Sequence, residues 1–443
     1  MKADARIAWV LTRGSDRREW WRISLTAVGA LLATGFALAA VAVAAVSGQV
    51  SIPFAHGLLN QPGQRAGVVL TLLLLLIPVF GLLSQCVRIG AVHRDRRMAG
   101  LRLAGASPGQ VRRIAALESS LACLAGSAVG FLVFAVLLAG SGRTTSPLTW
   151  VVFVLVVLAV PVVAALVSAF TLRRVVASPL GWVRRVRPVR GRPRTGRVLI
   201  LVATIAAVGA LLVLRDSRMV TLPVFAAVLL IGVGTLWAAG ASAAFLGRRL
   251  TERAKSPAVL IAAGRLRDDP WAASRAHAAL LLVTVVGVGF VGVRDVMLDQ
   301  LHDPGRHAPE SLDFYTTGLD LTGAAVLVAL LISLLGLAVG TAESLATRRR
   351  GLAAQAAAGV PQAVLARTLL LETALPLAPA VLLAGVGGMA VHLWYAAGVA
   401  PGTAPSLLPL LVPVGVYAAC LLAAATSLPL LRRMTHPSEL RFS

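Results

Sequence analysis

The sequence predicts an all-α integral membrane protein with about ten transmembrane helices. Apolar residues make up 58% of its 443 residues, and its mean hydropathy is +0.83. Uncharged runs of about 20 residues recur from end to end, and a soluble chain of this length has no core large enough to bury them. Barrel strands would be about 10 residues long with alternating polarity, so we expect the spans to be helices.

Ten hydrophobic spans are expected, each followed by a charged or Pro/Gly-rich break. They begin near Ile23, Gly67, Ala115, Leu148, Val198, Leu222, Ala276, Leu319, Thr368 and Leu407. The first span, Ile23 to Ser47, is longer than the apolar part of a signal peptide and is expected to stay as a membrane anchor. Cys86, Cys123 and Cys420 fall within spans, where cysteine behaves as a small apolar residue, so the sequence indicates neither a disulfide nor a zinc site.

Basic residues predict how the chain is oriented in the cell membrane. The chain carries 42 Lys and Arg residues and a net charge of +24. All but six lie on one side of the predicted spans; the exceptions are Arg65, Arg143, Arg215, Arg218, Arg294 and Arg306. The positive-inside rule makes the basic side cytoplasmic, together with both termini. Because the charge sits in short loops, it indicates membrane lipids as a partner and argues against nucleic acid.

Two stretches match without gaps at an offset of 254 residues, from Arg94 and from Arg348. Gly105 falls on Gly359, and Glu118 falls on Glu372. The predicted organisation is four, two and four helices. It comprises a cytoplasmic segment (1–22), a first four-helix repeat (23–183), a basic cytoplasmic linker (184–197), two intervening helices (198–247) and a second four-helix repeat (248–443).

Each copy of the matching stretch is predicted to form a helical hairpin at the cytoplasmic surface. Gly105 and Gly359 lie at the break, where glycine permits a left-handed helix cap. Ser107 and Pro108 then supply an N-cap and a first-turn proline for the next helix. The two hairpins would present short, rigid surfaces to a cytosolic partner.

The arginine run followed by Leu-Arg-x-x-Gly-Ala-Ser, Gln and a later Glu resembles the FtsX-like permease domain, which occurs in ABC transporters. The resemblance implies a dimer of cytosolic ATPase subunits that bind ATP and magnesium and grip both hairpins, with no cofactor on this chain. It also implies that residues of both hairpins couple the chain to the ATPase. In the first copy these are Arg97, Leu101, Arg102, Gly105, Ala106, Ser107, Gln110 and Glu118, and in the second copy Arg350, Gly359, Pro361, Arg367 and Glu372. The second copy has Ala356 in place of Arg102, so the first hairpin is expected to dock more strongly.

Other motifs favour structural explanations. Gly287, Gly289 and Gly292 form a Gly-x-Gly-x-x-Gly pattern, but it lies inside a predicted span and indicates helix packing. No phosphate-binding Gly-x-x-x-x-Gly-Lys motif occurs, so the chain is predicted to be no enzyme. Glu118 and Glu372 are interpreted as charges in the first turn of a span, with an energy-coupling role as the alternative.

The predicted function is export or extraction of a hydrophobic or amphipathic substrate, such as a peptide or lipid-like molecule. Two alternatives stay open. An ion-coupled secondary transporter usually places ionisable groups near the midplane, and no such cluster is evident here. A signalling relay would instead pass the motion to a partner such as a sensor kinase, and a second permease chain is a further possible partner.

Overall fold

The computed structural model describes residues 17–52, 54–88, 100, 103–140, 145–171, 221–301, 309–401 and 404–434. Helices dominate this part of the chain and no strand occurs in it, which confirms the predicted fold class. The chain divides into two compact units, Met1–Pro188 and Val189–Ser443. The division falls within the predicted 184–197 linker.

Proline marks the start of many of these helices. Proline is favoured at the first helical position because its missing N–H would have no partner there and its fixed φ suits the helix. The described helices that begin in this way start at Pro62, Pro108, Pro147, Pro257, Pro270 and Pro309.

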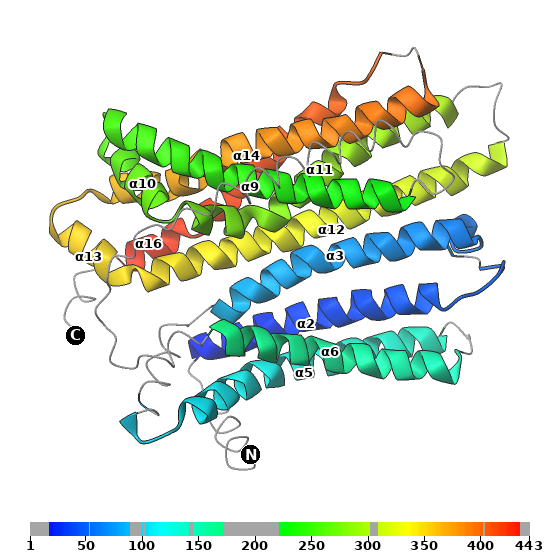
Figure 1. Ribbon diagram of the computed structural model, residues 1–443, viewed down its shortest axis with the longest axis horizontal. Helices are drawn as coiled ribbons and strands as arrows, with labels where there is room; N and C mark the ends of the chain where they lie inside the picture. Colours follow the sequence, from blue (N-terminus) through cyan, green and yellow to red (C-terminus); the bar gives the residue numbers. More distant parts are fainter. Residues whose placement is uncertain are drawn as a thin grey trace. The chain divides into compact units, whose positions relative to one another are not determined.

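The first unit is built around its first helix. It consists of α2 (Arg17–Ala44), η1 (Phe54–Gly57), α3 (Pro62–Arg88), α5 (Pro108–Gly140) and α6 (Pro147–Thr171). Helix α2 packs against α3, α5 and α6, and these long helices run side by side (Figure 1). Exposed Trp20 and Trp21 lie in the first turns of α2, where tryptophan typically marks a membrane interface.

Small residues bring α2 and α5 close together. A β-carbon added at Gly126 would lie only 2.0 Å from the carbonyl oxygen of Ala27. Within this contact, the hydroxyl of Thr34 donates a 3.0 Å hydrogen bond to that of Ser127. The small residues at this contact let the two backbones approach each other.

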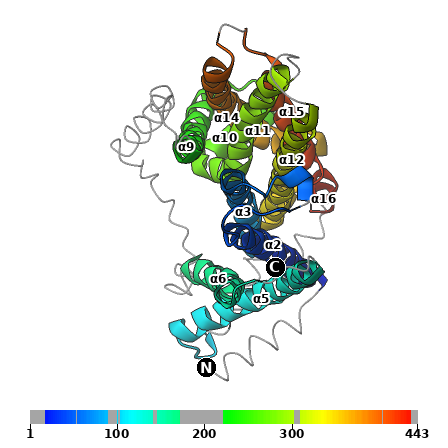
Figure 2. The same ribbon diagram turned by 90° about the vertical axis from the view of Figure 1, so that its right-hand side faces the viewer.

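The second unit contains the remaining described helices. They are α9 (Thr221–Arg253), α10 (Pro257–Asp268), α11 (Pro270–Leu301), α12 (Pro309–Thr347), α13 (Arg349–Ala357), α14 (Gln362–Val399), η2 (Leu408–Leu410), α15 (Leu411–Ala425) and α16 (Leu428–Met434). Figure 2 looks along the helices and shows α11 among α9, α12, α14 and α15, all of which it contacts. Helix α9, predicted as one of two intervening helices, packs on α10, α11 and α14.

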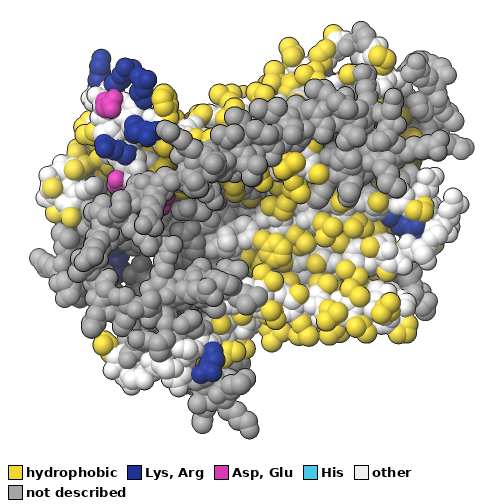
Figure 3. All heavy atoms as spheres, in the orientation of Figure 1, with side chains coloured by type: hydrophobic (Ala, Val, Ile, Leu, Met, Phe, Trp, Pro, Cys, Tyr) yellow, Lys and Arg dark blue, Asp and Glu magenta, His cyan; other side chains and the backbone are white. Residues whose placement is uncertain are grey.

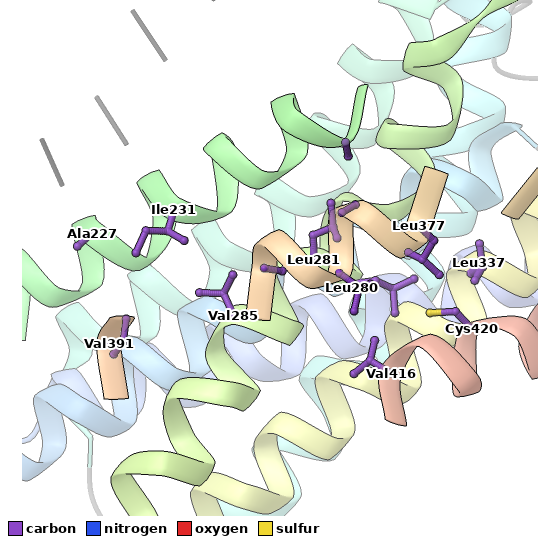
Figure 4. Packing of buried hydrophobic residues seen from close by; sticks show 14 residues of the cluster. Ala227, Ile231, Leu280, Leu281, Val285, Leu337, Leu377, Val391, Val416 and Cys420 are labelled. Atoms are coloured by element: carbon purple, nitrogen blue, oxygen red, sulfur yellow. The ribbon is translucent and has the colours of Figure 1, made fainter. Parts of the chain in front are cut away.

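An apolar core fills the space between the helices of the second unit. Figure 4 shows Leu280, Leu281 and Val285 of α11 packed with Leu377 of α14 and Val416 of α15. Leu281 and Leu377 have no exposed surface. Among the candidate spans that the structure describes, helix α11 is correspondingly the most enclosed. It forms the centre of the unit.

Eight of the described helices are long and apolar enough to span a membrane. They include the predicted spans that begin near Ile23, Gly67, Ala115, Leu222, Ala276, Leu319, Thr368 and Leu407. The predicted span near Leu148 corresponds to α6, whose apolar stretch Pro147–Val163 is shorter than the other eight. The predicted span near Val198 lies outside the described residues, so a total of ten stays a prediction.

The described surface fits a multi-pass membrane protein. Hydrophobic side chains cover the flanks of the first unit's helices (Figure 3), and Val136 and Leu137 of α5 are about two-thirds exposed. In the second unit, Lys and Arg side chains gather where α9 ends and α10 begins (Figure 3); these are Arg248, Arg249, Arg253 and Lys255. Apolar flanks with a basic end are typical of a chain whose basic loops face the cytoplasm.

Candidate functional site

The first hairpin has the predicted turn. The Ala104 N–H donates a 2.9 Å hydrogen bond to the Gly100 carbonyl, which closes a helical turn. Gly105 follows with a φ of +95°, in the left-handed region that glycine adopts without strain. The chain then enters α5 at Pro108. Gly105 therefore forms the turn that leads from Leu103 into α5.

A capping box fixes the start of the helix that follows. The Gln110 N–H donates to the Ser107 hydroxyl oxygen at 3.2 Å, and the Ser107 N–H donates to Gln110 Oε1 at 2.8 Å. Each side chain thus bonds a backbone N–H that α5 itself leaves without a helical partner. This confirms the predicted N-cap role of Ser107 and assigns Gln110 to the same cap.

The second hairpin repeats the turn with a different cap. Gly359 follows α13 with a φ of +89°, and the Ala358 N–H donates to Ala354 as Ala104 does to Gly100. The N–H groups of Gly359 and Val360 donate to the carbonyls of Ala356 and Gln355, both at 3.0 Å. This pair of bonds is a Schellman motif. Pro361 occupies the N-cap position of α14, where no side chain supplies a capping bond.

Leucines anchor the second hairpin to the rest of its unit. Leu352 of α13 is buried together with Leu365 and Leu369 of α14, Leu345 of α12 and Leu431 of α16. Its outer surface contains the exposed residues Arg350, Ala357 and Gly359. The hairpin therefore has a buried inner face and a free outer face among the described residues.

Glu372 is held by two arginines. Its Oε2 accepts a 3.0 Å hydrogen bond from Arg348 Nη1 at the start of the hairpin, and its Oε1 accepts one from Arg265 Nη1 on α10. The Glu372 side chain is only 15% exposed. One largely buried carboxylate thus joins three segments: the hairpin entrance, α10 and α14.

The prediction that Glu118 and Glu372 are first-turn charges was wrong. Helix α5 begins at Pro108 and α14 at Gln362, so each glutamate lies ten residues inside its helix. The field of a helix end falls off within the first turn and cannot stabilise a charge at that depth. Hydropathy marks where a span enters the membrane, whereas these helices begin earlier, at the hairpin turn. Glu118 is buried in the first unit.

The other predicted coupling residues lie in varied settings. Arg350 and Arg367 are exposed, and Ala106 is half-buried. Arg97, Leu101 and Arg102 lie outside the described residues. The sequence did not single out Leu103, whose side chain is 74% exposed beside Gly105, or Arg265. In the sequence, Leu103 differs from its neighbours only as an isolated leucine between polar and small residues. Sequence spacing gave no indication that Arg265 would have a role.

The glycine pattern in α11 serves helix packing, as predicted. A β-carbon at Gly289 would contact Val391 of α14 at 3.4 Å, and one at Gly292 would lie 2.3 Å from the His392 ring. Side chains of α14 therefore occupy the space beside these glycines, which are not part of a phosphate-binding loop. Cys86, Cys123 and Cys420 are free and buried, in keeping with their predicted apolar role.

The long helices and their apolar flanks define a multi-pass membrane protein. Residues 67–180 match the family model of the FtsX-like permease C-terminal domain. The chain thus contains an FtsX-like permease domain, the domain of ABC-transporter permeases, over about a quarter of its length. The match includes the first hairpin and confirms the resemblance there, whereas the duplication stays a prediction. No curated protein and no solved structure matches the chain.

Proposed function

We propose that this chain is the membrane subunit of an ABC transporter whose ATPase is a separate cytosolic chain. The observation that carries the proposal is the pair of hairpins, in which Gly105 and Gly359 adopt the same left-handed turn 254 residues apart. Two equivalent cytoplasmic surfaces suit a dimeric partner, which presents the same docking face twice. The partner would supply ATP and magnesium.

Each hairpin is continuous with a long helix, which gives docking a mechanical consequence. Helix α5 has 33 residues and α14 has 38, so they extend about 50 and 57 Å at 1.5 Å per residue. Both exceed the roughly 30 Å of a bilayer's hydrocarbon core. Closure of the ATPase subunits on the hairpins would therefore move helices that reach the outer side. We propose that this motion drives export or extraction of a hydrophobic or amphipathic substrate.

The first hairpin is the stronger docking surface in this proposal. Leu103 presents an exposed apolar side chain beside the turn, where the second hairpin has only Ala357. An apolar anchor that enters a pocket on the partner typically dominates the binding energy of a small interface. The capping box of Ser107 and Gln110 also holds this hairpin rigid before docking.

The test is a comparison of hairpin variants in a pull-down of the ATPase from solubilised membranes. Leu103→Asp should reduce ATPase recovery at least tenfold, because a charge would be buried without a partner. Ala357→Asp should have a smaller effect. Leu137→Ala, on the lipid-facing flank of α5, is the matched control and should leave recovery unchanged. Full recovery with Leu103→Asp would contradict docking at this hairpin.

A further inference from the structure

The ion pairs of Glu372 point beyond the hairpins to α10. We propose that Arg265 is a positioning residue that ties α10 to the second hairpin, so that α10 and α11 move when an ATPase presses on that hairpin. The inference rests on the proposed function and adds a route of transmission to it. Arg265 and Glu372 are 107 residues apart in sequence and meet only through the fold.

Neutralising the charge of Glu372 does not by itself explain why two arginines contact it. Arg348 already supplies one positive charge to Glu372 at 3.0 Å. Arg265 adds a second from a different helix, and its side chain is the less exposed of the two, at 25% against 43%. A single carboxylate with two guanidinium partners therefore acts as a junction between segments. Its additional effect is to fix where α10 lies relative to the hairpin.

Two further contacts hold helix α10, one on α14 and one on α9. Buried Thr368 of α14 contacts the Ala258 carbonyl at 3.5 Å, one turn before Glu372. On the side of α9, a β-carbon at Gly247 would lie 2.8 Å from the backbone nitrogen of Arg267. Backbone packed this closely has no room to yield. A displacement of Glu372 would therefore shift α10 as a body rather than bend it.

The connection from α10 to the core of the unit is short. Asp269 alone separates α10 from α11, which begins at Pro270. Helix α11 is the most enclosed of the described candidate spans and packs along α14. The junction thus offers a second path from the hairpin to the outer side, through Arg265, α10 and α11, alongside the direct path through α14.

The tie itself is tested on the chain alone, in lipid nanodiscs, by hydrogen exchange. Arg265→Gln and Glu372→Gln should each speed exchange in residues 257–268 severalfold, because both release α10. Arg348→Gln is the matched control: it removes the other arginine and should leave α10 exchange unchanged. Unchanged α10 exchange in Arg265→Gln and Glu372→Gln would overturn the inference.

The coupling role is tested on the complex with the co-purifying ATPase. Spin labels at Asp299→Cys and Pro401→Cys report the outer ends of α11 and α14, in a chain without its native cysteines. ATP with vanadate should change their distance in the otherwise unaltered chain and with Arg265→Lys, but not with Arg265→Gln, although each variant retains the same amount of ATPase. An unaltered response in Arg265→Gln would overturn the coupling role.

The two experiments separate this inference from the proposed function. A chain with native Arg265 that retains no ATPase contradicts the proposed function and removes the coupling role with it. The exchange measurement still decides whether Arg265 ties α10 to the hairpin. Arg265→Gln could instead lose ATPase retention and the distance change to the same extent. That result would show that Arg265 only maintains the structure of the chain, and it would also overturn the inference.

Discussion

Gly105 and Gly359 adopt nearly the same left-handed backbone conformation, with φ values of +95° and +89°, at equivalent positions of the two hairpins. Nothing lies within 4 Å of a β-carbon added at either position, so space does not require glycine there. The backbone conformation requires glycine, because a β-branched residue in the left-handed region is strained by roughly 1–2 kcal/mol. The turn itself is thus the feature that the two hairpins share.

Gly105→Val should weaken ATPase association more than Gly359→Val does. Both strain the turn, but the first hairpin carries the exposed Leu103 and the side-chain cap. The measurement is ATPase recovery in a pull-down at matched membrane expression. Gly351→Val, within α13 and with open space around it, is the control for added bulk. Equal losses would show that the hairpins dock symmetrically, and no loss from either would remove their coupling role.

Gly126→Ala should destabilise the first unit by about 1–3 kcal/mol or more, because the added methyl group would overlap the Ala27 backbone of α2. Thermal unfolding in detergent measures the effect as a lower midpoint. Gly35→Ala on α2 is the control, since nothing lies within 4 Å of a β-carbon there. A midpoint for Gly126→Ala at or above that of Gly35→Ala would show that α2 and α5 do not pack as described.

Gly292 and His392 should behave as a coupled pair. His392 is fully buried, and its two ring nitrogens have no hydrogen-bond partner among the described residues. Truncating the ring leaves a cavity but also removes the cost of burying polar atoms without a partner, so His392→Ala should cost less than the 2–5 kcal/mol typical of a large buried side chain. Gly292→Ala should destabilise, since its methyl would meet the imidazole.

The double variant tests this coupling. If the ring causes the clash, His392→Ala should reduce the cost of Gly292→Ala, with an interaction energy of at least about 0.5 kcal/mol in thermal unfolding. Strictly additive costs would mean that the methyl group added at Gly292 does not touch the His392 ring. A large loss of stability from His392→Ala alone would show that the ring has a partner.

The predicted orientation places Lys255 inside and Pro401 outside the cell. Both are exposed in the structure. Lys255 follows α9 and Pro401 follows α14, and these two helices end at opposite ends of the second unit (Figure 1). A cysteine at Pro401 should react with a membrane-impermeant thiol reagent added to whole cells. A cysteine at Lys255 should react only after the cells are opened. The reverse pattern would contradict the orientation drawn from the arginines.

The sequence was sufficient for the fold class and for the hairpin turns because both depend on local rules. Lipid-facing helices need long apolar runs, a left-handed cap favours glycine, and Ser107 with Gln110 is a recognisable capping box. Arg265 was missed because its partner is 107 residues away, a relationship that only packing creates. The helix starts before Glu118 and Glu372 were misjudged because hydropathy follows the lipid boundary rather than the backbone hydrogen bonds.

In the function that we propose, this chain works with a separate ATPase docked on its hairpins. The most direct measurement is to purify the chain from its own membranes in mild detergent, identify bound proteins by mass spectrometry, and assay ATP hydrolysis with and without them. We expect an ABC ATPase to co-purify, crosslink to a photoreactive residue at Leu103, and account for all hydrolysis. Hydrolysis by a preparation free of any ATPase chain, or a Leu103 crosslink only to other proteins, would contradict the proposed function.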